Sequence, residues 1–471
     1  MTGYAPIAAI VAALGITLLL NFGRRSARLG GVVLVLAGAA PLVVGRFPGV
    51  VDASNISPLL AAAALVATLL TGALAVAFVR LPWLAVLLGL LAGLRIPLNL
   101  ADPSPTNHLV PLWLVVIAGL LALLWRSRRD GWPAPRLGPI GWALSAWVLL
   151  AAISLAWSSG QDQGAYTFVA FYASFGSLVA IVGSLDPREG LPRAAVTTQV
   201  VLMVLLALVA VYQVTAGHLF WNPELIDGNM RLGYVRANSL FWDASALGRF
   251  EGLALIVIVG LLALSRRRWN VGAAAVLCAI GFTGLVLSYS RSGLVMVVAG
   301  VVLVALVWRP RLAVLLAGTA VVGILAAAAL TIAGTADLER LTSGRVSIAA
   351  EGLGAFESAP LIGVGLGGYP SSHTVVLGIA AELGVLGLVT FLTLLATIAL
   401  AVLRPADPGS DRTFRLVAAI ALAALLTHSM LDSGLFDDAA TWVLIAILGV
   451  LAAPSAIPRG AAPAPEPAPG T

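Results

Sequence analysis

The polar residues best suited to chemistry gather in one stretch, from Gly334 to Gly387, of a chain that is otherwise almost continuously apolar. This stretch holds His373, Arg340, Arg345 and several glutamates. Ionisable side chains are costly beside hydrocarbon, so membrane proteins keep them where they bind or react. We therefore expect the chemistry of the protein to lie in this stretch.

Histidine and arginine suggest which chemistry that would be. Histidine is the side chain best suited to accept a proton near neutral pH, which makes His373 a candidate base. An arginine presents a planar fork of donors that can bind phosphate at two points, as Arg345 and Arg291 could do. Simpler interpretations remain open: a histidine at a helix start can be a structural cap, and Arg291, in SYSRSG (288–293), can be an interfacial arginine.

The long loop at 335–373 carries two further patterns. A helix is predicted from Thr342 or Ser343 to the residues before Pro360, with Arg345, Ile348, Ala349, Gly352 and Phe356 on one face. Such a helix can lie on the membrane surface or be a solvated surface helix. The glycine-rich segment LIGVGLGGYP (361–370) is not a nucleotide-binding fingerprint, and we expect a turn at which the backbone approaches a ligand closely.

The elements that must position these residues are predicted to be membrane-spanning helices. The chain has 471 residues, of which 60% are hydrophobic and 10% charged, too apolar for a water-soluble globule. Near-spanning apolar runs occur at 5–22, 29–45, 58–79, 81–94, 109–125, 137–158, 164–185, 194–215, 250–265, 271–289, 293–308, 312–333, 374–403, 413–430 and 439–453. We predict an all-α polytopic bundle of about 14 or 15 spans, the short fourth run being a candidate re-entrant segment. The single cysteine, Cys278, excludes an internal disulfide.

The arginines predict the orientation of the bundle. With the N-terminus outside and one crossing per run, the connections on the other side hold 18 of the 27 arginines, which fits cytoplasmic positive charge and a cytoplasmic C-terminus. Six of the arginines left on the outer side gather near the long loops, and their gathering there suggests an anionic ligand. They are Arg231, Arg236, Arg249, Arg291, Arg340 and Arg345. The basic residues are all arginine, which we do not interpret as a nucleic-acid surface.

Three motifs, in this order, resemble those of the O-antigen ligase/polymerase superfamily of bacterial membrane proteins. They are the Ser-Arg pair of SYSRSG (288–293), the segment SGRVSIAAEGLGAFESAPLIGVGLGGYPSSH (343–373) and AELGVLGL (381–388), which contains the Glu-x-Gly-x-x-Gly pattern. The similarity covers roughly residues 230–450. Two departures are Thr374, where the family often has Asn, and LFWDASALG (240–248), which lacks an Asn-Pro pair.

The resemblance implies a fold of the C-type glycosyltransferase (GT-C) kind and an enzyme that uses a polyprenyl-diphosphate-linked glycan donor at the outer face of the bacterial inner membrane. It implies diphosphate binding by Arg291 and Arg345 and activation of a glycan or glycolipid acceptor by His373. We expect further substrate binding from Arg236, Arg249, Arg340 and Glu382. Neither a metal nor a cofactor is expected. The partners would be the donor, the acceptor and membrane lipids, with no nucleic acid.

The predicted organisation is an N-terminal membrane region at 1–216, a C-terminal region at 217–453 with the external loop 335–373, and a Pro/Ala-rich tail at 454–471, which is expected to be disordered. A transporter or lipid-linked glycan flippase is the main alternative, and a non-enzymatic scaffold is a third. Transporters usually keep ionisable residues in mid-membrane. Apart from Glu382, mid-span charges are nearly absent, which favours chemistry at the outer face. A ligase and a polymerase are not distinguished.

Overall fold

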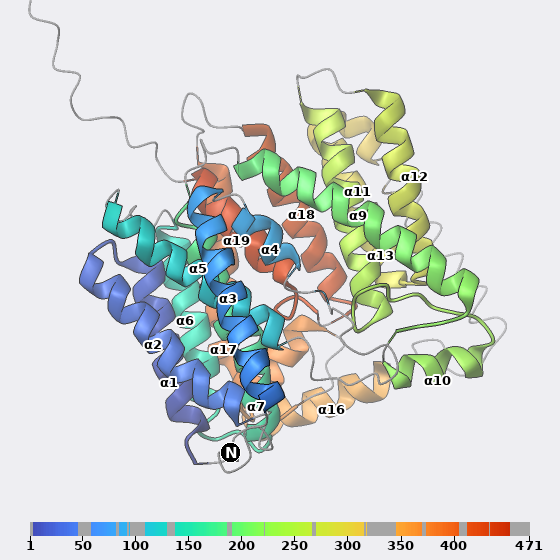
Figure 1. Ribbon diagram of the computed structural model, residues 1–471. Coiled ribbons are helices and arrows are strands. Elements are labelled where there is room, and N and C mark those ends of the chain that lie inside the picture. Colours follow the sequence, from blue (N-terminus) through green and yellow to red (C-terminus); the bar gives the residue numbers. More distant parts are fainter. Residues whose placement is uncertain are drawn as a thin grey trace, which may run out of the picture.

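The structure, a computed structural model, describes residues 3–45, 58–81, 84–91, 94, 109–129, 137–185, 191–220, 222–265, 270–314, 317, 345–369, 374–404, 412–432 and 434–452. Within these ranges the chain forms helices and turns and no strand. The predicted all-α class is therefore confirmed. Figure 1 shows the helices as one bundle.

The helices follow the order of the apolar runs. Their bounds are α1 (Ala5–Asn21), α2 (Arg25–Val44), α3 (Pro58–Arg80), α4 (Leu84–Leu91), α5 (Leu109–Arg129), α6 (Pro139–Ser154), α7 (Gln161–Thr167), the π-helix η3 (Phe168–Ala173), α8 (Ser174–Val182), α9 (Leu191–Ala216), α10 (Pro223–Leu232), α11 (Ala244–Leu264), α12 (Val271–Leu287), α13 (Arg291–Trp308), α16 (Arg345–Ser358), α17 (Val375–Leu403), α18 (Arg412–Ser429) and α19 (Ala439–Ala452).

Six of the described helical segments are long and apolar enough to cross a membrane, and several shorter apolar helices accompany them. The structure is thus that of a polytopic helical membrane protein. The predicted short run at 81–94 appears as α4, which at eight residues is about 12 Å long and cannot cross a bilayer alone. The predicted run at 312–333 lies almost entirely outside the described residues.

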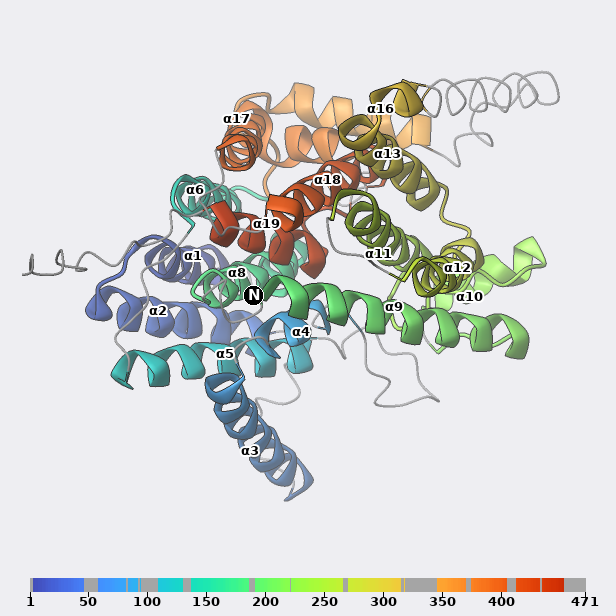
Figure 2. The ribbon, with the colours of Figure 1, turned by 90° about the horizontal axis from the view of Figure 1, so that it is seen from above.

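The helices pack in two groups. One contains α1, α2, α6, η3 and α17, and the other contains α9, α11, α12, α13 and α18. Helix α19 contacts α17 of the first group and α18 of the second, and so joins the two groups (Figure 2). Glycines allow the closest approach: a Cβ on Gly15 of α1 would lie 2.6 Å from the Gly31 carbonyl oxygen of α2.

Two helices that do not cross the bundle lie along one of its ends. In Figure 1, α10 and α16 run across the lower end, where the N-terminus and α7 also lie. Helix α10 was not predicted, because the sequence at 217–250 was interpreted as loop. Its start is fixed by Asn222, whose side chain accepts a hydrogen bond from the Leu225 amide at 3.1 Å.

Helix α11 begins at Ala244, six residues before the predicted apolar run at 250–265. The Asp243 side chain caps it by accepting from the Ser245 amide. Arg249 is therefore inside a helix and not at the edge of a loop, which corrects the prediction. The apolar-run criterion missed this first turn and a half because it contains Arg249 and other non-aliphatic residues.

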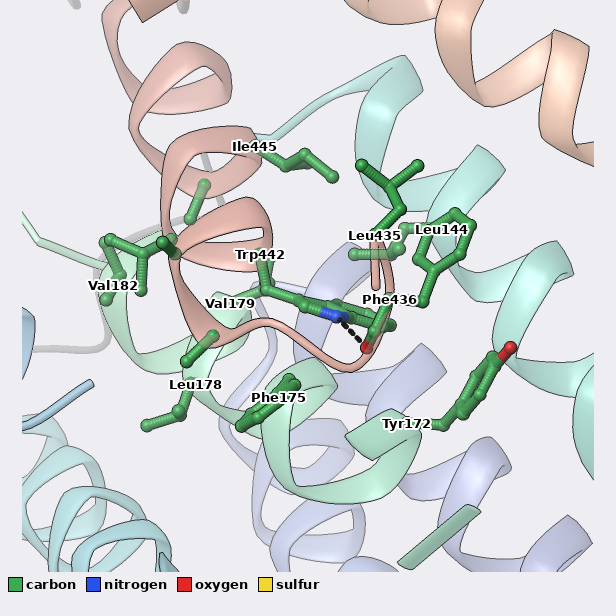
Figure 3. Close-up of a cluster of buried hydrophobic side chains, with 14 of the residues drawn as sticks. Leu144, Tyr172, Phe175, Leu178, Val179, Val182, Leu435, Phe436, Trp442 and Ile445 are labelled. Atoms are coloured by element: carbon green, nitrogen blue, oxygen red, sulfur yellow. Dashed lines mark hydrogen bonds between the residues drawn. The ribbon is translucent and has the colours of Figure 1, made fainter. Parts of the chain in front are cut away.

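A cluster of aromatic rings forms the core where the two groups meet. Trp147, Tyr172, Phe391, Phe436 and Trp442 lie with ring centroids 4.7–6.4 Å apart. The Trp442 indole donates to the Phe436 carbonyl at 2.8 Å and fixes the turn before α19 (Figure 3). At one side of the cluster, the Tyr172 hydroxyl points away from Trp442 (Figure 3).

Candidate functional site

Helix α17 is broken at Gly384, and the glycine-rich segment fills the break. Gly384 has φ 64° and ψ −159°, far from helical values. The amides of Val364 and Gly365 donate to the carbonyls of Ala381 and Glu382, both at 2.9 Å, and the Val385 amide donates to the Pro360 carbonyl at 2.8 Å. The segment thus satisfies backbone groups on both sides of the break, as irregular backbone at membrane depth requires.

The Glu382 side chain completes this connection. Its Oε1 accepts a hydrogen bond from the Gly367 amide at 2.9 Å. The Glu-x-Gly-x-x-Gly pattern therefore has a structural meaning: Glu382 holds the glycine-rich segment, and Gly384 provides the break in which the segment lies. The predicted role of Glu382 in substrate binding remains a prediction.

The turn between α6 and α7 holds the other side of the glycine-rich segment. The Ser158 hydroxyl donates to the Leu366 carbonyl at 2.7 Å, and the Leu366 amide donates to the Ser154 hydroxyl oxygen at 3.1 Å. A Cβ on Gly160 would lie 2.1 Å from the Gly367 carbonyl oxygen. Only glycine fits at such an approach of two backbones.

Tyr369 connects the same segment to α16. Its hydroxyl donates to the Ile348 carbonyl at 2.6 Å, and burial together with the Glu351 carboxylate raises the pKa of the Tyr369 hydroxyl. On α16, Gly352 is buried and Ile348 and Phe356 are half-buried, whereas Ala349 is exposed. The helix therefore packs against the protein along the stripe formed by Ile348, Gly352 and Phe356.

These elements enclose a cavity of about 260 Å³. Its walls come from α7 and η3, the glycine-rich segment, the first turns of α17 and the turn before α19. The lining residues are Gln163, Thr167, Phe171, Tyr172, Gly367, Tyr369, Val375, Gly378, Ile379, Glu382, Phe436 and Asp437. The cavity combines two carboxylates, an amide and hydroxyl groups with an aromatic side, which is the composition of a ligand site. π-Helical turns are frequently found at functional sites.

Asp437 faces the cavity beside a buried ion pair. Arg249 Nε lies 3.0 Å from Asp438 Oδ2, and Arg249 Nη2 lies 3.9 Å from Asp437 Oδ1. The Arg249 side chain is 8% exposed, whereas that of Asp437 is 48% exposed. Desolvation within the protein walls raises the pKa of the Asp437 carboxyl, and the Arg249 guanidinium acts in the opposite direction. Arg249 therefore links α11 to the turn before α19 through its ion pairs with the two aspartates.

Replacing Arg249 is expected to destabilise the protein. Arg249→Met leaves the mostly buried Asp438 without its cation, and breaking a buried pair costs about 3–5 kcal/mol. Thermal unfolding of the detergent-solubilised protein should shift to a clearly lower midpoint. Arg309→Met is the matched control, because Arg309 is exposed and lies over the Trp308 ring. Equal midpoints for the two variants would contradict the structural role of Arg249.

The predicted anion-binding arginines occupy different positions. Arg291 is exposed at the first turn of α13, where the Ser290 hydroxyl oxygen accepts from the Gly293 amide at 3.1 Å. Tyr289, next to it, lies 4.6 Å from Tyr234 between ring centroids. A Cβ on Gly248 of α11 would be 2.3 Å from Ser290 Cβ, so α11 packs directly on this turn. Arg236 is half-buried in the α10–α11 connection.

Two predicted site residues lie outside the described residues. They are His373 and Arg340. Arg345 is the first residue of α16, so its position is given by the backbone only. His373 directly precedes Thr374, after which α17 starts at Val375. The glycine-rich segment, Glu382 and the start of α17 are therefore brought to one cavity, while the roles of Arg291, Arg345 and His373 stay predictions. Among the described residues no cluster of three or more metal-ligating side chains occurs.

Sequence reasoning missed one wall of the cavity and one buried carboxyl. The wall is the polar segment SSGQDQGAYT (158–167) with Tyr172, in a region interpreted as generic spans. The sequence feature that could have identified this wall is a polar stretch with two glycines between two apolar runs. The carboxyl is Glu251 of α11, fully buried against Gly284 of α12. Glu251 therefore joins Glu382 as a second buried carboxyl within a predicted apolar run.

Fold and cavity together define a polytopic α-helical membrane protein with a polar site at one end of its bundle. Residues 275–392 match the family model described as O-antigen ligase, and this match supports the resemblance to the O-antigen ligase/polymerase superfamily. The matched range contains SYSRSG, α16, the glycine-rich segment and the break in α17. At the family level, the match supports glycan transfer of the ligase or polymerase type. No curated protein matches the chain.

Proposed function

We propose that the protein transfers a glycan from a polyprenyl-diphosphate donor to a hydroxyl acceptor at the outer face of the bacterial cytoplasmic membrane. The observation that carries this proposal is the cavity formed by the glycine-rich segment, Glu382 and the start of α17, all within or next to the family match. In this proposal α10, α16 and the cavity face the exterior, and the chain ends in the cytoplasm. We also propose that the chain is organised as an N-terminal membrane region at 1–216 and a C-terminal region at 217–453.

The proposed chemistry uses a donor that already carries a good leaving group. Arg291 and Arg345 bind the diphosphate and stabilise the negative charge that grows on it, and Arg236 and Arg340 add to the positive field. The acceptor oxygen attacks the anomeric carbon from the opposite side, so the new glycosidic bond forms as the bond to the diphosphate breaks, with inversion. His373 takes the acceptor proton. Positioning of the two substrates supplies much of the remaining acceleration.

A phosphate-binding arginine at position 345 predicts a graded effect of substitution. Arg345→Ala should reduce transfer by at least about a hundredfold, and Arg345→Lys should recover only part of the rate, because lysine cannot make the two-point contact. The rates are measured with a purified undecaprenyl-diphosphate-linked glycan in proteoliposomes. Full activity of Arg345→Lys would contradict the two-point contact.

A transporter or flippase is the second candidate, and one observation favours it. Discontinuous helices, such as α17 with its break at Gly384, also form the binding sites of many secondary transporters. Proteoliposomes loaded with labelled donor separate the two functions. Release of free polyprenyl diphosphate with a longer or acceptor-linked glycan supports transfer. Movement of intact donor between leaflets, without its consumption, would overturn it.

A further inference from the structure

The described lining of the cavity is acidic, whereas the surface proposed to bind the diphosphate carries arginines. Its described lining contains the carboxylates of Glu382 and Asp437 and no arginine, lysine or histidine. The cation nearest in the ion-pair network, Arg249, is engaged with Asp438 and Asp437. Two carboxylates disfavour a further anion by like-charge repulsion. The described part of the lining is thus unsuited to a diphosphate and suited to a ligand that donates hydrogen bonds.

The polar groups in the cavity retain capacity to accept hydrogen bonds. A carboxylate offers about four acceptor positions. Glu382 uses one of them for the Gly367 amide and another for the Tyr369 amide, and the remaining positions are open to a ligand. Asp437 stands 3.9 Å from Arg249, beyond hydrogen-bond distance, and its side chain is half-exposed into the cavity. Gln163 and Thr167, from α7, add an amide and a hydroxyl to the lining.

Aromatic rings form the apolar side of the same cavity. Tyr172 and Phe436 both line it, and their rings are stacked with centroids 6.4 Å apart. The Tyr172 hydroxyl points away from the Trp442 side of the cluster (Figure 3). A flat apolar side together with converging hydrogen-bond acceptors matches a sugar ring, which has C–H faces and a rim of hydroxyls.

The walls of the cavity are fixed before any ligand binds. The glycine-rich segment is hydrogen-bonded to the α6–α7 turn through Ser154 and Ser158, and to α17 across the break at Gly384. A site whose groups are held in place loses less entropy when it binds. At about 260 Å³ the cavity has the volume of roughly nine waters of the bulk liquid, enough for one sugar ring.

We propose that this cavity binds one sugar ring of the acceptor, that this ring is neutral or carries an amine, and that the diphosphate of the donor binds elsewhere. This assignment rests on the proposed function and adds to it the substrate that the cavity takes. Glu382 and Asp437 accept hydrogen bonds from hydroxyl or ammonium groups of the sugar, and Tyr172 and Phe436 contact its face. An acidic sugar is excluded by the two carboxylates.

A single-cysteine protection experiment tests the assignment. In a Cys278→Ser background, Thr167→Cys introduces one thiol into the cavity, and Ser358→Cys introduces one at the exposed end of α16 as the matched control. Each protein in nanodiscs is alkylated by a small maleimide in the presence of glucose, glucosamine, glucuronic acid or inorganic pyrophosphate. Glucose and glucosamine are expected to slow alkylation at position 167 severalfold and to leave position 358 unchanged.

Three outcomes would overturn the assignment. They are protection by pyrophosphate, protection by glucuronic acid equal to that by glucosamine, and the absence of protection by either sugar. Because alkylation needs no turnover, the assignment can fail while donor consumption is intact, and the proposed function can fail while sugars still protect. The two failures are therefore distinguishable.

Kinetics give a second, independent test. Gln163→Ala removes one hydrogen-bonding group from the cavity, and should raise KM for the acceptor roughly three- to tenfold. The KM for the donor should not change. Gln161→Ala is the matched control, since Gln161 lies two residues away on α7 and outside the cavity lining. A change in donor KM alone would assign the cavity to the donor and contradict the inference.

Discussion

His373→Ala is expected to abolish glycan transfer and to leave the protein folded in the membrane. Removal of a general base lowers the rate by about 10²–10⁴-fold, because the acceptor hydroxyl then loses its proton only to water. The measurement is donor consumption by purified protein in proteoliposomes, with thermal unfolding as the check on folding. His373 directly precedes Thr374, and α17 then contributes its first turns to the cavity.

The control for this variant is another histidine on the chain. His218 is exposed in the connection between α9 and α10, and His218→Ala should keep its transfer rate within about twofold, as expected for a surface change. Undiminished turnover by His373→Ala would remove the proton-transfer role. A loss of activity in both variants would indicate a general defect and not a loss of base catalysis.

Gly363→Ala is expected to disrupt the site as a whole. Gly363 has φ 67°, and a Cβ there would lie 2.2 Å from the Glu382 carbonyl carbon and 2.3 Å from its oxygen. The left-handed conformation costs a non-glycine residue about 1–2 kcal/mol, and the clash with backbone adds to that. We expect a lower unfolding midpoint and near-complete loss of transfer, because the glycine-rich segment must move away from the break in α17.

Gly354→Ala is the matched control for this change. Gly354 lies in α16, and a Cβ there would meet nothing within 4 Å. Alanine is a better helix former than glycine by about 0.8–1.0 kcal/mol, so this variant should be as stable as the wild type or slightly more stable. Wild-type stability and activity of Gly363→Ala would show that the segment is not seated in α17 as described.

Much of the fold follows from the sequence because spanning helices are set by local composition. Apolar runs located most of the described helices, including the short run that became α4. The criterion failed where polar residues lie inside a helix, as at the start of α11, and where a short amphipathic helix such as α10 follows a capping asparagine. Hydropathy reports transfer from water to lipid, and residues that face other protein do not obey it.

The candidate site is less predictable, because its contacts join distant parts of the chain. The motifs around Arg291, Arg345, His373 and Glu382 are visible in the sequence, but nothing local indicates that Ser158 would bond to Leu366, 208 residues away. The same holds for Arg249, whose partners Asp437 and Asp438 belong to the turn before α19. A single sequence shows which residues are unusual for an apolar chain, but it does not show which of them are in contact.

The seating of the glycine-rich segment on the α6–α7 turn limits how this protein can be dissected. The family match ends at residue 392 and begins at residue 275, yet Gln163, Thr167 and Tyr172 supply one wall of the cavity, and the turn before α19 supplies another. A fragment trimmed to the matched range would expose backbone that now lies against Gly160 and Gly164. Exchanging specificity between relatives would accordingly require transplanting the amino-terminal turn together with the carboxy-terminal motifs.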